Sequence, residues 1–260
     1  MTRANLVRTV SAAASVASVI CFLLVITAPR GRAQGDNGND EATRIQQGFR
    51  VAPVPLNLSG LNQQQINLVG LGSYLVNAAN DCNFCHAAGG PPNFNFEMGH
   101  NPYFLGQGPK KTDPTTYLAG GSDFFSALPF NVPPGTAYGS YVGPDIIARN
   151  LTPDIHKLPE GGHTLPQFME ILRTGVDLDK IHPTCTKSSP TIAPANCIPP
   201  PVDGSRLQIM PWPDFQDMTD HDIEAIWTYL SVIPCIDNKS STPPAGAPNE
   251  LRNAGCPSVH

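Results

Sequence analysis

The pentapeptide Cys-Asn-Phe-Cys-His at residues 82–86 constrains this chain more than any other feature of its sequence. Two thiols three positions apart can reach the two vinyl groups of one haem, while the adjacent imidazole can reach its iron. The spacing therefore predicts that Cys82 and Cys85 carry thioether bonds and that His86 is the proximal iron ligand. Because no second C-x-x-C-H occurs, we expect one covalently attached haem c.

Two other uses of a C-x-x-C pair fit the sequence less well. A zinc site would need a second ligand pair at comparable spacing, and Cys185 and Cys197 are too far apart to supply one. A thioredoxin-like motif would need a strand–helix–strand setting, which the surrounding sequence does not indicate. Haem attachment is the favoured interpretation.

The composition limits how much of the chain can be regular structure. Its 28 prolines and 23 glycines favour loops, because proline ends helices and cannot donate in central strands. At 260 residues the chain is still long enough to bury a substantial core. We expect a small helical core that carries long coil insertions.

Residues 1–33 have the pattern of an export signal. Arg3 and Arg8 form a charged start, residues 10–28 are uncharged and largely apolar, and residues 31–33 offer a small-x-small cleavage site. We expect cleavage and a periplasmic location. The alternative is an uncleaved membrane anchor, because about 19 uncharged residues could just span a bilayer.

The charge of the exported chain narrows the classes of partner. Removing residues 1–33 takes away four arginines and no acidic residue, which changes the formal net charge from −5 to −9. Such an acidic protein is a poor partner for nucleic acid and for anionic membrane surfaces.

Four further cysteines lie in the second half of the chain, at positions 185, 197, 235 and 256. An even number in an exported chain predicts two disulfides, with three connectivities. Short loops favour Cys185 with Cys197 and Cys235 with Cys256.

Three helices are expected from caps and apolar spacing. One begins after Asn62 and ends near Asn77, and its Gly70 and Gly72 suggest that another helix crosses it closely. A second spans about 165–174 after a Thr164 cap, and the third follows Thr219 and stops before Pro234. We expect residues 34–60 to be an irregular linker.

Several segments together resemble a known family. They are a glycine- and tyrosine-bearing helix before CNFCHAAGG, ARNLTPD at 148–154, LRTGVD at 172–177, and MPWPDFQDMTDHDIEAIWTYLSVIP at 210–234. These resemble class I monohaem cytochrome c domains related to the cytochrome subunits of bacterial membrane-bound alcohol and aldehyde dehydrogenases. The resemblance implies an all-α cytochrome c-type fold at 61–235, with insertions at 91–147 and 184–209 and a tail at 236–260.

The resemblance also implies His86 and Met210 as axial ligands. Met210 is favoured independently, because a thioether is a good haem ligand and the flanking prolines stiffen its loop. Met169 and Met218 fit core positions, while Met98 stays open. His182 is the main rival, because members of the family that the chain resembles reach their methionine soon after the position of Pro183, whereas about 26 residues intervene here.

Six-coordinate iron leaves no open site, so we expect electron transfer and no enzymatic activity. The expected partners are a redox protein such as a dehydrogenase or an oxidase. The alternative is a peroxidase-like enzyme or a redox or gas sensor whose sixth iron position is open or exchangeable. Arg173 is either a haem-propionate contact or a solvent-facing residue, and Trp212 packs either on the haem or in the core.

Overall fold

The computed structural model describes residues 37–87, 96–122, 124, 144, 146–186, 197–198, 202–238 and 255–256. The chain divides into two compact units, 1–39 and 40–260, and only the opening residues of one helix are described in the first. The described helices are α2 (Asn37–Val51), α3 (Gln63–Tyr74), the π-helix η1 (Leu75–Ala79), α4 (Cys82–Cys85), α5 (Pro159–Gly162), α6 (Leu165–Thr174), α7 (Trp212–Phe215) and α8 (Asp220–Leu230).

The described part of the chain is rich in helices, and its β-structure consists of isolated bridges, such as the one between Val176 and Arg206. This agrees with the expected all-α class. Within the same residues, no helix is both long and apolar enough to cross a membrane. The predicted export segment, residues 1–33, lies outside the described residues.

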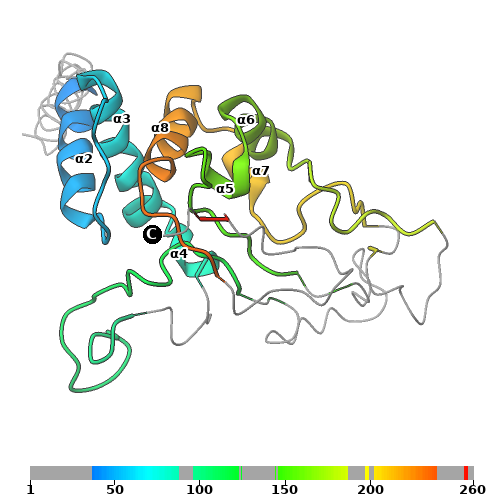
Figure 1. Ribbon diagram of the computed structural model, residues 1–260, viewed down its shortest axis with the longest axis horizontal. Coiled ribbons are helices and arrows are strands. Elements are labelled where there is room, and N and C mark those ends of the chain that lie inside the picture. Colours follow the sequence, from blue (N-terminus) through cyan, green and yellow to red (C-terminus); the bar gives the residue numbers. More distant parts are fainter. Residues whose placement is uncertain are drawn as a thin grey trace, which may run out of the picture. The chain divides into compact units, whose positions relative to one another are not determined.

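Helices α3 and α8 pack directly against each other and form the centre of the core (Figure 1). Their close approach depends on Gly72, because a Cβ there would overlap the carbonyl oxygen of Ala225. The capping box between Asn62 and Gln65 starts α3, as the sequence predicted. Helical structure then continues through η1 to Ala79, which confirms the expected end near Asn77.

The linker predicted for residues 34–60 is wrong in its first half, because 37–51 form helix α2. This helix packs on α3 through Gly48, where a Cβ would overlap the carbonyl oxygen of Gly70. The Ser73 hydroxyl donates to the Gly48 carbonyl at 2.7 Å. The two glycines of α3 thus serve two neighbours, since Gly70 meets α2 and Gly72 meets α8.

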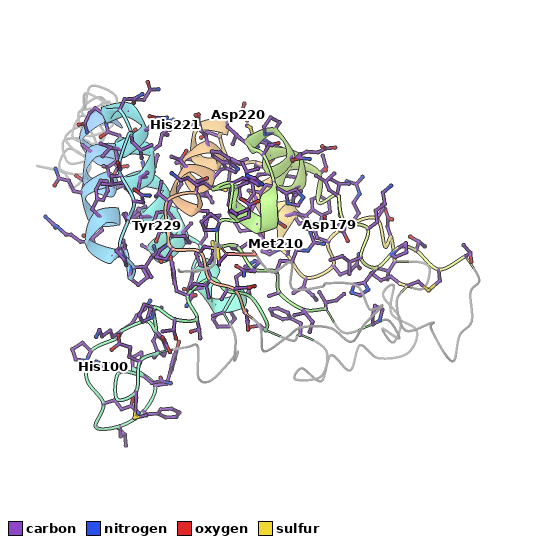
Figure 2. All side chains as sticks on the ribbon, viewed as in Figure 1. His100, Asp179, Met210, Asp220, His221 and Tyr229 are labelled. Carbon is purple, nitrogen blue, oxygen red and sulfur yellow. A yellow bond between two sulfur atoms is a disulfide. The ribbon has the colours of Figure 1, made fainter. Side chains whose placement is uncertain are left out.

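Helices α6 and α8 have the caps and bounds that the sequence predicted. Thr164 and Gln167 form a capping box, and Gly175 ends α6 in the left-handed conformation. Thr219 accepts a hydrogen bond from the Asp222 amide at the start of α8. Arg173 joins these helices through a 2.6 Å ion pair with Asp220, whose position at the start of α8 Figure 2 labels.

Arg173 and Trp212 both have packing roles here. The indole of Trp212 covers the end of α6, where a Cβ on Gly175 would overlap it, and donates to the Leu207 carbonyl at 3.2 Å. Trp212 therefore ties the chain at Leu207 to the end of α6, while the Arg173–Asp220 pair joins α6 to α8 at the surface, where the Arg173 side chain is 30% exposed.

Two disulfides join the pairs that the sequence favoured, Cys185 with Cys197 and Cys235 with Cys256. The first holds Ile198, 1% exposed, against the chain at 183–185 through backbone hydrogen bonds. The described residues of both expected insertions are turns and irregular segments, as predicted.

The segment after residue 148 is fixed by a buried asparagine. Asn150 is fully buried and donates to the Ile236 carbonyl at 2.7 Å. Its side-chain oxygen accepts from the amide and the hydroxyl of Thr152. The turn signature at 150–154 therefore anchors this segment to the chain that follows α8.

Candidate functional site

The C-x-x-C-H motif occupies one short turn of helix after an irregular approach. Helical structure changes to the π form in η1, and Asp81 then takes a left-handed conformation at φ +44° before α4 begins. Such departures from regular backbone often accompany functional sites. Because α4 is a single turn, Cys82 and Cys85 lie on the same side of it.

Neither motif cysteine forms a disulfide, unlike the four cysteines in the second half of the chain. Burial is the main cause that raises the pKa of the Cys82 thiol to about 12, with Asp81 and Cys85 adding to it. Burial likewise raises the pKa of Cys85. Burial therefore favours the neutral thiol form of both side chains.

The loop at 117–122 clamps the motif. The Leu118 amide donates to the Asn83 side chain at 2.9 Å, and the Gly120 amide donates to the His86 carbonyl at 2.8 Å. Gly120 is required there, because its φ is +71° and a Cβ would crowd the backbone of Ala148 and Arg149. This loop therefore fixes where the motif points.

The His86 ring is held by a backbone acceptor. Its Nδ1 lies 2.8 Å from the carbonyl oxygen of Arg149. Because a carbonyl can only accept, Nδ1 carries the proton and Nε2 keeps a lone pair for another partner. Burial lowers the pKa of His86, which keeps the ring neutral and able to bind a metal ion.

One cavity brings the predicted site residues together. Cys82, Cys85, His86 and Met210 all line it. The space between its walls that holds no protein atoms is about 1330 Å³, including the part open to solvent. Apolar side chains of α6 and α8 cover much of the remaining wall: Phe168, Ile171, Leu172, Ile226 and Leu230.

The structure separates the candidate sixth ligands. Met210 lines the cavity, and Figure 2 labels it. Met169 and Met218 pack against the core, as Met210 does, but are not among the residues that line the cavity, and Met98 is fully exposed. His182, however, also lines the cavity and is 7% exposed. Met210 and His182 are therefore the two described candidates.

Sequence reasoning missed a buried ionic cluster beside the cavity. The guanidinium of Arg149 lies 2.6 Å from Asp177, 3.1 Å from Asp179 and 3.4 Å from Glu160. The His163 ring lies 2.9 Å from Glu160 and 3.9 Å from Asp179. We call these five residues the Arg149 cluster. No sequence signal joins Arg149 to carboxylates 11, 28 and 30 positions away.

The described residues contain no group of three or more His, Cys, Asp or Glu side chains placed to hold a metal ion.

The resemblance to cytochromes c rests on the sequence motifs alone, because comparisons with known proteins found no match. No family model matches the chain, and neither a curated protein nor a solved structure matches it.

Proposed function

We propose that this chain is an exported monohaem c-type cytochrome. It carries single electrons between a periplasmic or membrane redox enzyme, such as a dehydrogenase, and another carrier or a terminal oxidase. The observation that carries the proposal is the convergence of Cys82, Cys85, His86 and Met210 on one cavity.

These residues fit haem c. The two thiols are unoxidised and lie on one side of α4, and His86 offers Nε2 because Nδ1 donates to Arg149. The cavity opens to solvent along one side, and its wall is formed mostly by apolar side chains. Its apolar wall suits a flat apolar macrocycle.

When bound, the haem iron supplies one-electron oxidation and reduction. The residues of the chain hold and shield it. Cys82 and Cys85 anchor one edge, His86 is oriented by its hydrogen bond to Arg149, and the side chains of α6 and α8 exclude water. Phe84, 42% exposed between the two cysteines, offers an apolar contact to a redox partner.

The disulfides support export, because structural disulfides persist in oxidising compartments such as the periplasm.

The first test is covalent attachment. Full-length chain made in cells with a haem-attachment system should retain haem after denaturation and extraction with acidified organic solvent. The C82A/C85A double variant should lose its haem under the same treatment. The matched C185A/C197A variant removes two cysteines that form a disulfide with each other, and it should keep the haem. Haem extracted from the wild type would refute the proposal.

The second test assigns the sixth ligand. Met210→Ala should convert a low-spin visible spectrum to a high-spin or ligand-exchanging one and lower the potential, because a thioether favours ferrous iron. Met218→Ala and Met98→Ala are the controls and should leave both unchanged. If His182→Ala changes the spectrum while Met210→Ala does not, the ligand pair is bis-histidine. A high-spin wild type would instead favour an enzyme or a sensor.

A further inference from the structure

Arg149 makes two kinds of contact at once. Its main-chain carbonyl accepts the hydrogen bond from His86 at 2.8 Å, and its guanidinium binds three carboxylates at 2.6 to 3.4 Å. The residue is 8% exposed. Since side chain and carbonyl belong to one residue, the ion pairs restrict where the carbonyl can lie. The ion pairs of the guanidinium therefore help to fix the position of the carbonyl oxygen that accepts the hydrogen bond from the His86 ring.

The Arg149 cluster brings three carboxylates to one guanidinium, at 2.6 to 3.4 Å. Glu160, Asp177 and Arg149 all line the cavity. Glu160 and Asp177 are 4% and 6% exposed, so solvent screens their charges weakly.

The backbone at Glu160 also departs from what its residue type prefers. Its φ of +52° lies in the left-handed region, which costs free energy for any residue with a Cβ. The surrounding contacts hold it there, including the 2.9 Å contact with His163. Buried strain of this kind clusters at functional sites.

We propose that the Arg149 cluster positions the proximal histidine and lowers the potential of the haem, an inference that rests on the proposed function. A firm carbonyl acceptor strengthens the hydrogen bond from Nδ1, which makes the imidazole a more basic ligand. Each buried carboxylate of the cluster stabilises ferric iron, which carries one more positive charge than ferrous iron. Both effects act in the same direction. The five side chains are positioning residues, since none of them is an iron ligand.

The charge effect is tested with holoprotein from the full chain. Glu160→Gln removes a buried negative charge with little change of shape, and a redox titration followed by visible absorption should give a higher midpoint potential than the wild type. Glu41→Gln is the matched control on α2, where the carboxylate is exposed, and it should leave the potential unchanged. If Glu160→Gln does not fold, Asp179→Asn decides the question, because Asp179 is the most exposed carboxylate of the cluster. Its control is the exposed Asp40→Asn.

The positioning effect needs its own readout. Asp177→Asn weakens the shortest contact of Arg149, and the Nδ1 proton of His86 should then exchange with solvent faster by nuclear magnetic resonance. An unchanged exchange rate would refute the positioning role, and unchanged potentials in the charge variants would refute the electrostatic role. A wild type without covalent haem would refute the proposed function instead, so the two failures are distinct.

Discussion

The two walls of the cavity are built in different ways. Helices α6 and α8 supply apolar side chains held by caps and by close helix packing. The rest of the lining includes Arg149, His182 and Met210, which come from irregular chain held by ion pairs, buried amide contacts and a disulfide. Helix caps and apolar spacing, which are local in the sequence, thus determine one part of the site. Polar contacts between residues far apart in the sequence determine the other part.

The largest effect is expected where the helical wall has no room to adjust. Gly72→Val should lower the free energy of unfolding by more than about 4 kcal/mol, because its Cβ would overlap the Ala225 carbonyl. Thermal or chemical denaturation followed by circular dichroism measures this. Gly60→Ala is the contrast, since Gly60 has open space around it but a φ of +80°, and it should cost about 1–2 kcal/mol. Equal losses would show that packing at the crossing does not limit stability.

The next effect concerns the disulfide of the irregular wall. The C185S/C197S double variant should lose about 3 kcal/mol of unfolding free energy, because the bridge closes a short loop in the unfolded chain. Chemical denaturation of the oxidised protein provides the comparison. Peptide mapping without reduction should find Cys185 joined to Cys197 and Cys235 joined to Cys256. A crossed pairing would overturn the loop arrangement described here.

A buried amide should matter less than the disulfide but more than any surface group. Asn150→Ala removes the acceptor of the Thr152 amide and the 2.7 Å donor to the Ile236 carbonyl, which keeps only a 3.2 Å bond from the Thr152 hydroxyl, at a cost of about 2 kcal/mol. Asn57→Ala is the control, because Asn57 is exposed and accepts only one local hydrogen bond. Urea unfolding should separate the two variants. Equal midpoints would remove Asn150 from the contacts that hold this wall.

The smallest effect is a pH dependence. Burial opposes ionisation of Asp177, but Arg149 and hydrogen bonds outweigh it and hold the pKa of Asp177 below its ordinary value of 3.8. A lowered pKa in the folded state means stability that is present above pH 3.8 and is lost as the pH falls through the folded value. Asp177→Asn should therefore flatten the acid limb of a stability-against-pH curve. An unchanged limb would contradict a paired Asp177.

The sequence predicted the helical side well, because its signals are local. The Thr164 and Gln167 capping box and the left-handed Gly175 lie at the ends of the segment that they define. Gly70 and Gly72 predicted a close crossing, although not that two different helices would use them. Helix α2 was missed because its sequence is largely polar and only a few residues, such as Ile45, pack inward.

The irregular side could be predicted only in part. Short loops made the two disulfide pairings predictable, and the C-x-x-C-H spacing marked one edge of the cavity. No residue near Arg149 in the sequence predicts its ion pairs, because its carboxylate partners lie in other segments and contact it only in the folded chain. The sequence could not decide between Met210 and His182 either, because both come from irregular segments and both line the cavity in the folded chain.

The contrast between paired and unpaired cysteines has a consequence for how the protein is made. Four cysteines form disulfides, whereas Cys82 and Cys85 are free thiols, and the proposed function requires these two to stay reduced until they react with haem. An oxidant that forms the first two bridges can also join neighbouring thiols, and exchange between thiols and disulfides can rescue them only while they are accessible. Under the proposed function, attachment of haem to Cys82 and Cys85 therefore competes with formation of a disulfide between them. Cells that lack a reductant for exported thiols should accumulate a folded, colourless by-product.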